Sequence, residues 1–330
     1  MKKYNVAVVG ATGMVGRTML KILQERDFSI DKLYLYSSSR SAGTSIEFNN
    51  KKVTVEELTE NSFSKEIDIA FFSAGSSTSL KYAQIASANG IVVIDNSSAF
   101  RMDKDIPLVV PEVNAHDITN HKGIISNPNC STIQALVVLK PLHDKYKIKR
   151  IVFSTYQAVS GSGVNGIQDL ERGLLGEPNT FYPHQIANNC LPHIDSFEEN
   201  GYTKEELKMI NETKKILHDD DLRITATTVR VPVYYSHSES INIEFENEFE
   251  INELKKVLEE APGIIVLDNP KENLYPLPTE VAGKDEVFVG RIRKDYSVDC
   301  GINLWVVADN IRKGAATNAV QIAEEVIRNL

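Results

Sequence analysis

Cys130 is the residue whose position most clearly suggests chemistry. It lies in the stretch SNPNCST, residues 126–132, between a short apolar run, residues 123–126, and the apolar segment IQALVVLKPLHDKY. This pattern predicts a strand-to-helix corner with Cys130 in the first helical turn. A thiol there feels the positive end of the helix dipole, which favours the nucleophilic thiolate. A buried, unreactive cysteine is the alternative.

A nucleophilic thiolate needs a partner for proton transfer, and the sequence offers seven histidines. Spacing alone does not choose among them. His237 ranks narrowly first, because it follows an alternating apolar strand and stands in a polar, serine-rich turn. His184 and His193 share a loop in which they can serve a structural role.

The N-terminal segment YNVAVVGATGMVGRTMLKIL combines a buried strand, a glycine turn and an amphipathic helix. Gly10, Gly13 and Gly16 have the spacing GxxGxxG. Glycines allow a tight turn and let a pyrophosphate approach the N–H groups at the start of the helix. An ordinary turn is the alternative, but the strand before and the helix after favour dinucleotide binding.

The residues after the next strand, KLYLYSSSRSAG, bear on which dinucleotide binds. An Asp or Glu about 20 residues past the glycines grips a free ribose 2′-hydroxyl. Here the chain has Ser37–Ser39, Arg40 and Ser41 instead. Hydroxyl donors and a guanidinium suit a 2′-phosphate, so the pattern favours NADP over NAD. A solvated serine-rich loop is the alternative.

The surrounding pattern predicts an α/β protein of two domains. Strands alternating with short helices through the first part indicate a Rossmann-type parallel sheet, with Ala74-Gly75 and residues 96–98 at strand ends that bind ligands. The later segments RITATTVRVPVYY, SINIEFE and CGINLWVVADN alternate apolar and polar residues. They predict an α+β domain whose sheet is mixed and largely antiparallel, with one solvated or dimer face.

Composition narrows the class of protein. The chain has 330 residues, a net charge of −9 and no dense basic run outside residues 145–150, which argues against nucleic acid or an anionic membrane as a partner. No signal peptide or membrane span is recognisable, which predicts a cytoplasmic protein. Cys130, Cys190 and Cys300 are widely spaced without a CxxC, so neither disulfides nor a metal site is expected.

Taken together, the motifs resemble the aspartate-β-semialdehyde dehydrogenase family along essentially the whole chain. They are, in order, VAVVGATGMVG, SSRSAG, DNSSAFRMD, VVPEVN, NPNCST, STYQAVSGSG, EELKMINETKKIL, VRVPVYYSHSES and ADNIRKGAA. The resemblance implies a homodimer, NADP(H) with inorganic phosphate as co-substrate, and a last helix that returns to the first domain. The implied domains are residues 1–128 with 310–330 for NADP, and 129–309 for catalysis and dimerisation.

The resemblance also implies roles for individual residues. Cys130 is the nucleophile that forms a thioester, His237 the acid/base and Gln157 a residue that orients the substrate. The implied substrate-binding residues are Arg101, Asn129, Gln157, Glu205, Lys208 and Arg230. The implied cofactor-binding residues are Gly10, Thr12, Gly13, Met14, Val15, Ser38, Arg40, Ser41, Ala74, Gly75, Ser160, Gly161 and Asn310. By spacing alone, Glu205 and Lys208 at i and i+3 are typical of a solvated surface pair.

Three other functions remain open at this stage. An N-acetylglutamyl-phosphate reductase keeps the cysteine, the histidine and NADP, but needs no Glu for a free amino group, so Glu205 in EELKM favours the aspartyl substrate. A cysteine hydrolase does not need the glycine-rich nucleotide turn. An inactive NADP-binding regulatory protein does not need both Cys130 and His237.

Overall fold

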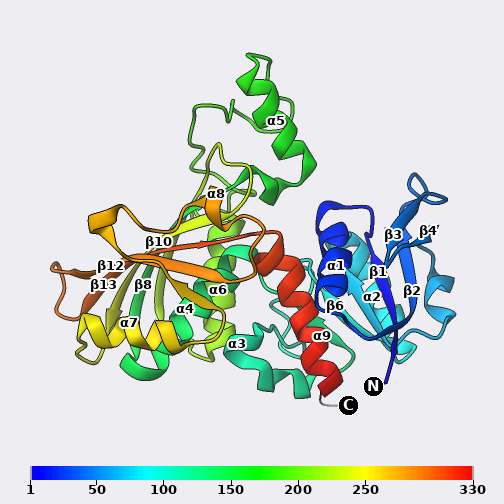
Figure 1. Ribbon diagram of the computed structural model, residues 1–330, viewed down its shortest axis with the longest axis horizontal. Coiled ribbons are helices and arrows are strands. Elements are labelled where there is room, and N and C mark those ends of the chain that lie inside the picture. Colours follow the sequence, from blue (N-terminus) through cyan, green and yellow to red (C-terminus); the bar gives the residue numbers. More distant parts are fainter. Residues whose placement is uncertain (1, 329–330) are drawn as a thin grey trace. The chain divides into compact units, whose positions relative to one another are not determined.

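The structure is a computed structural model that describes residues 2–328. The chain divides into two compact units, each described by itself (Figure 1). The first unit holds the chain up to Asn129 together with the segment from Ala315 onward, and the second runs from Cys130 to Gly314. Within the described residues, no helix is both long enough and apolar enough to cross a lipid bilayer.

The first unit is a parallel sheet covered by helices. Its strands are β1 (Tyr4–Val9), β2 (Ile30–Ser37), β3 (Ser45–Phe48), β4 (Lys51–Glu57), β5 (Ile69–Phe72), β6 (Val92–Asp95) and β7 (Ile124–Ser126). They follow the order β3-β4-β2-β1-β5-β6-β7, and only the β3–β4 edge pair is antiparallel. This arrangement confirms the predicted Rossmann-type sheet.

Helices pack on both faces of this sheet because its central strands are apolar on both sides. They are α1 (Met14–Glu25), α2 (Ser76–Ala88), α3 (Pro111–Asn114) and α9 (Asn318–Arg328). Val6 and Val8 of β1 belong to one core cluster with apolar residues of α1 and α9. Ala7 and Val9, the alternate residues, belong to a second cluster with α2. The last helix therefore completes the fold of the first unit.

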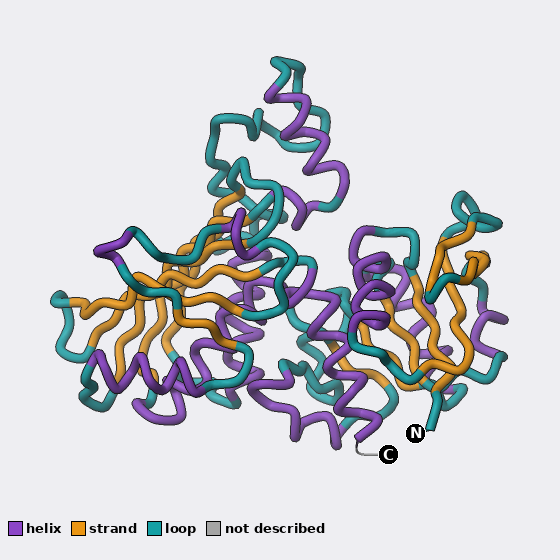
Figure 2. The backbone as a smooth tube through the Cα atoms, in the orientation of Figure 1, coloured by secondary structure: helices purple, strands orange, loops and turns teal. Residues whose placement is uncertain are grey.

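The second unit has a mixed sheet (Figure 2). Its strands are β8 (Ile148–Gln157), β9 (Arg223–Arg230), β10 (His237–Phe245), β11 (Ile264–Val266), β12 (Val287–Asp295) and β13 (Gly301–Ala308). Their order is β11-β12-β13-β10-β8-β9, antiparallel at the centre and parallel in the outer pairs β11–β12 and β8–β9. The predicted mixed sheet is confirmed.

Helices cover one face of this second sheet. The helices of the unit are α4 (Cys130–Tyr146), α5 (Val164–Leu174), α6 (Lys204–Leu217), α7 (Ile251–Glu260) and α8 (Pro278–Val281). Of these, α4, α6 and α7 contact the strands from the same side, while α5 and its flanking loops stand away from the sheet (Figures 1 and 2). On the other face Tyr156 is 38% exposed, and its ring lies 5.6 Å from that of Trp305 at a tilt of 46°.

One predicted local structure is wrong. His237 was expected in a polar turn, but it is the first residue of β10 and is fully buried. The turn ends at Ser236, whose φ of +72° reverses the chain before the strand begins. His237, Glu239 and Ile241 alternate with more exposed residues along β10, so the histidine lies on the helix-covered face.

Candidate active site

Cys130 begins α4, as the sequence predicts, and its side chain is half-buried. The chain after β13 passes directly over it at Gly314. A Cβ added to Gly314 would lie 2.8 Å from the Cβ of Cys130, closer than two carbon atoms can pack. The position of the thiol therefore depends on a residue without a side chain.

Gly314→Ala is expected to displace Cys130 and lower kcat by about tenfold to a hundredfold, because sub-ångström errors at a reacting atom are costly. The rate of Cys130 alkylation by iodoacetamide should change in parallel. Far-ultraviolet circular dichroism checks that the variant is folded. Unaltered kcat and alkylation in a folded variant would show that the contact does not position the thiol.

His237 is held as a neutral imidazole. Its Nδ1 accepts a hydrogen bond from the N–H of Ala158 at 3.0 Å, so the ring proton is on Nε2. Burial lowers the pKa of His237 well below its ordinary value, and the charge of Arg230 lowers it further. Nε2 has no hydrogen-bond partner among residues 2–328, and it lies against the exposed Gly161, where an added Cβ would come within 3.2 Å. Nε2 is therefore a buried donor that makes no hydrogen bond within the described residues.

Gln134 joins the cysteine helix to the histidine strand. It lies four residues after Cys130 in α4, on the same face of the helix, and is fully buried. Its Nε2 donates to the carbonyl of His237 at 3.3 Å. The helix that begins with Cys130 is thus tied to the start of the His237 strand by a side chain that sequence reasoning missed.

Gln157 and Arg230 are opposite each other in register, as the last residues of the parallel strands β8 and β9. Both are buried. Arg230 donates from Nη1 to the carbonyl of Ala158 at 2.7 Å, while its Nε has no partner in the described part of the chain. The same Nη1 lies near Gly161. A guanidinium with a spare donor in a buried site is suited to binding a carboxylate.

Glu205 and Lys208 lie in the first turns of α6 and are not a solvated pair. Glu205 is 5% exposed, accepts from Gln157 Nε2 at 3.2 Å and from Lys208 Nζ at 3.1 Å. Lys208 also donates to Asp195 at 2.8 Å. Burial alone would lower the pKa of Lys208, but the two carboxylates outweigh it and the pKa is raised. No motif in the sequence marks Asp195 as a site residue.

A capping box fixes the start of α6. Thr203 accepts from the N–H of Glu206 at 3.3 Å, and Glu206 accepts from the N–H of Thr203 at 2.7 Å. The other oxygen of Glu206 accepts from the N–H of Thr228 in β9 at 3.2 Å. The helix that carries Glu205 is therefore tied to the strand that carries Arg230.

Arg101 and Asn129 belong to the first unit and are both buried. Arg101 donates from Nε to the carbonyl of Asn127 and from Nη2 to the carbonyl of Asn96, both at 3.0 Å. These carbonyls follow β7 and β6. Arg101 is thus fixed at the carboxyl ends of two neighbouring strands, where parallel sheets bind ligands.

The glycine turn of the first unit borders a cavity of about 500 Å³. Among the predicted cofactor residues, those that line it are Gly10, Thr12, Gly13, Ser38 and Ala74. Gly10 has a φ of +85°, and a Cβ on it would lie 2.3 Å from the carbonyl of Ser73. The close approach of this turn to the turn after β5 therefore requires glycine at position 10.

The other predicted residues of the first unit surround this cavity without lining it. Met14 and Val15 begin α1, and Gly75 precedes α2. Ser41 contacts Thr12, whose Oγ1 is 2.8 Å from the Oγ of Ser37. Arg40 is exposed in the turn that follows β2.

Glu57 lines the cavity and was missed by sequence reasoning. It ends β4 and pairs in register with Ser37 at the end of β2. The turn after β2 contains no acid, but the neighbouring parallel strand supplies one from the same edge of the sheet.

Ser160, Gly161 and Asn310 lie in the second unit. Asn310 Nδ2 donates to Ser160 Oγ at 3.0 Å, and its Oδ1 accepts from the N–H of Ser236 at 3.0 Å. Asn310 therefore fixes the strained residue before His237. This structural role comes in addition to the predicted contact with NADP.

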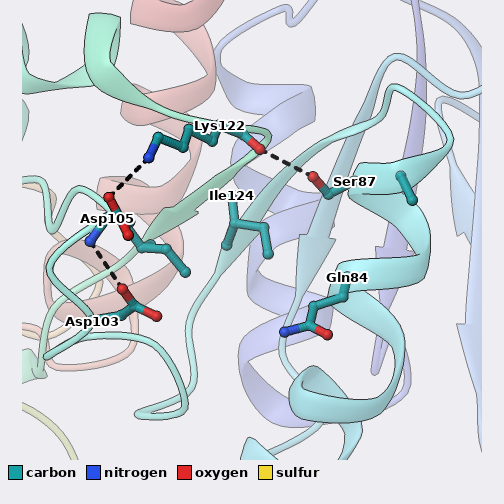
Figure 3. A pocket seen from close by; sticks show the side chains of 8 residues that line it. Gln84, Ser87, Asp103, Asp105, Lys122 and Ile124 are labelled. Carbon is teal, nitrogen blue, oxygen red and sulfur yellow. Dashed lines mark hydrogen bonds and ion pairs between the residues drawn. The ribbon is translucent and has the colours of Figure 1, made fainter.

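A second hollow of the first unit, of about 340 Å³, contains none of the predicted residues (Figure 3). Lys122 Nζ pairs with Asp105 at 2.9 Å, which holds the pKa of Asp105 below its ordinary value. The carbonyl of Lys122 accepts from Ser87 at 3.3 Å. Asp103 accepts from the N–H of Asp105 at 2.9 Å. In this hollow the polar groups named above bind one another, and this does not favour a ligand site.

Comparison with known proteins gives matches to both units. The profile of the semialdehyde dehydrogenase NAD-binding domain matches residues 5–121, and that of the semialdehyde dehydrogenase dimerisation domain matches residues 139–313. An aspartate-semialdehyde dehydrogenase of Aquifex aeolicus is 58% identical, with 98% of each chain covered. A crystal structure of aspartate semialdehyde dehydrogenase II of Vibrio cholerae, complexed with ASA, is 49% identical with a TM-score of 0.96, over 99% of each chain. The enzyme of Candida albicans, solved with NADP, is 27% identical with a TM-score of 0.78, over 98% of each chain.

Proposed function

Since the chain belongs to the aspartate-semialdehyde dehydrogenase family, we propose that it reduces L-aspartyl 4-phosphate to L-aspartate 4-semialdehyde with NADPH. The observation that carries this proposal is the arrangement of the second unit. The helix of Cys130 is joined to His237, beside a buried arginine and a buried glutamate at neighbouring element ends. A nucleophile, a proton donor and partners for both charges of an amino acid are present together.

In the proposed reaction the thiolate of Cys130 attacks the acyl carbon, the S–C bond forms and the C–O bond to phosphate breaks. NADPH, when bound, supplies the hydride that reduces the acyl group. The S–C bond then breaks, and the thiolate is restored as the aldehyde leaves. The Nε2 proton of His237 is proposed to stabilise the negative oxygen and to exchange protons during these steps; the unpaired Nε2 supports this role.

Arg230 and Glu205 support the aspartyl substrate. Arg230 is proposed to bind the α-carboxylate, and Glu205 the α-amino group. An N-acetylated substrate has no ammonium group for Glu205, so this buried carboxylate favours the free amino acid over N-acetylglutamyl phosphate. Gln157, which donates to Glu205, is proposed to orient the substrate. Arg101 and Lys208 are proposed to hold the phosphate or acyl phosphate, and Asn129 is proposed as a further substrate-binding residue.

The cofactor proposal is NADP(H), with inorganic phosphate released in the biosynthetic direction. The cavity beside Gly10 supports it, because it is lined by the glycine turn that leads into α1, where backbone N–H groups suit a pyrophosphate. The proposed contacts are Gly10, Thr12, Gly13, Met14, Val15, Ser38, Arg40, Ser41, Ala74 and Gly75 of the first unit, with Ser160, Gly161 and Asn310 of the second.

The proposal also covers the pathways that the enzyme serves, its oligomeric state and its location in the cell. Aspartate semialdehyde leads to lysine with diaminopimelate, threonine, methionine and isoleucine. A homodimer is supported by the match to a dimerisation domain and by exposed apolar residues of the second unit, Leu174 at 57% and Leu175 at 79%. A cytoplasmic location is supported by the free thiols of Cys130, Cys190 and Cys300, which are typical of a reducing compartment.

The test is reduction of NADP by aspartate semialdehyde, followed by NADPH absorbance with and without inorganic phosphate. Activity that requires phosphate is the expected result. Turnover of only the N-acetylglutamate analogue would keep the thioester chemistry and overturn the substrate. Inactivity with both, in folded protein that still binds NADP, would favour a regulatory protein.

Arg40 provides a prediction about cofactor choice. Arg40→Ala is expected to raise the KM for NADP about tenfold and to leave the KM for NAD unchanged, because a charge-assisted contact to the 2′-phosphate is lost. Lys52→Ala, which removes another exposed cation of the first unit, is the control. Equal effects on both cofactors would remove Arg40 from the site.

A further inference from the structure

A buried polar row lies one step into the sheet from Gln157 and Arg230. Glu239 of β10 is opposite Thr155 of β8, which is opposite Thr228 of β9. All three have no exposed surface. Because opposite residues in neighbouring strands point to the same face, the three side chains form one row beneath the site.

Glu239 is the unusual member of this row. Neither of its carboxyl oxygens has a hydrogen-bond partner within residues 2–328, and the hydroxyl of Thr228 has none either. An ionised carboxylate in that position would lack the hydrogen bonds and the ion pair that a buried charge requires. Burial raises the pKa of Glu239 well above its ordinary value, and the like charge of Glu205 raises it further. Glu239 therefore retains its proton.

The row is connected to the substrate site. Gln157 donates from Nε2 both to Thr155 Oγ1 at 3.3 Å and to Glu205 Oε1 at 3.2 Å. Glu205 is the residue proposed above to bind the substrate amino group. Its charge acts on Glu239, and it accepts a hydrogen bond from Lys208.

We propose that Glu239 is a positioning residue which stays a neutral acid in this row, so that Glu205 alone presents a negative charge to the substrate amino group. This inference rests on the proposed function, since it explains how the amino-group site is kept singly charged. Two ionised carboxylates there would repel each other, and a fully protonated pair would not hold an ammonium group.

The protonation state can be observed without any substrate. Infrared spectra of the folded protein at neutral pH are expected to show the carbonyl stretch of a protonated carboxylic acid, which Glu239→Gln abolishes. Glu244→Gln is the matched control, because Glu244 is on the same strand but pairs with Lys149 at 2.6 Å. If the wild-type and Glu239→Gln spectra agree in this region, the proposal is overturned, whatever the enzyme catalyses.

Kinetics test the positioning role. Glu239→Gln keeps a neutral donor of the same shape, so KM for aspartate semialdehyde should stay within about threefold of the wild type. Glu239→Ala removes the buried side chain beside Thr155, and KM should rise about tenfold while kcat changes little, because Gln157 and Glu205 lose the support that positions them. Equal KM values for Ala, Gln and wild-type proteins, or a loss confined to kcat, would contradict the proposal.

Stability supplies an independent check with a definite sign. The folded protein keeps the Glu239 proton while the unfolded chain loses it above the ordinary pKa of 4.5, so wild-type stability falls as pH rises. The facing groups are Glu205 with Lys208 on α6, and His237 and Arg230 in the next row. The Tm of Glu239→Gln relative to wild type should therefore increase between about pH 5 and about pH 8. A pH-independent difference would mean that Glu239 is ionised in the fold.

Discussion

Cys130→Ser is expected to lower kcat at least about a thousandfold, in both directions of the reaction. The hydroxyl of serine fits the space of the thiol, but it is not ionised by a helix N-terminus and is a poor nucleophile. Substrate contacts through Arg230 and Glu205 are unaffected, so KM should change little. The measurement is phosphate-dependent NADP reduction, with a burst assay for the acyl-enzyme.

The remaining cysteines provide the controls. Cys190 is exposed and Cys300 half-buried, and neither lies at a helix start. Serine at either position should leave kcat unchanged. Iodoacetamide should label Cys130 first at neutral pH, despite the greater exposure of Cys190, because reactivity follows the thiolate. Faster labelling of Cys190 would count against Cys130 as the nucleophile.

Arg230→Lys is expected to lower kcat/KM about a hundredfold, mainly through KM. A lysine keeps the charge, but it cannot bind the carbonyl of Ala158 and a substrate carboxylate with one planar group. Steady-state kinetics with aspartate semialdehyde, which separates KM from kcat, is the measurement.

Arg223→Lys is the matched control, because Arg223 begins the same strand and is exposed. It should retain wild-type kinetics. If Arg230→Lys behaves in the same way, the α-carboxylate is bound elsewhere and the proposed orientation of the substrate is wrong.

Most of the fold could be predicted from the sequence because local patterns encode it. The glycine turn after β1 and the apolar runs of β5 and β6 indicate a parallel sheet directly. Strand pairing in the second unit was not encoded in this way. The parallel pair β8–β9 depends on α6 crossing between strands far apart in the chain, and alternation does not give direction.

The identities of the site residues could be predicted from the sequence, whereas their contacts and burial could not. Cys130 and His237 stand out by position or motif, but the ties made by Gln134 and Asp195 depend on tertiary contacts. Glu239 carried a signal that was overlooked. Glu239 is two residues away from both His237 and Ile241. Because side chains alternate along a strand, its carboxyl group must lie with theirs on the helix-covered face of β10.

The course of the chain has a consequence for synthesis on the ribosome. The apolar face formed by Val6, Val8 and Ile94 is covered by Val320 and Ala323 of α9, which is made last. The second unit is translated in full before that helix exists, so it can fold while the nucleotide-binding unit still exposes part of its core. A nascent chain that has not yet produced α9 therefore exposes an apolar surface of the kind that chaperones bind, and docking of α9 is the step that covers it.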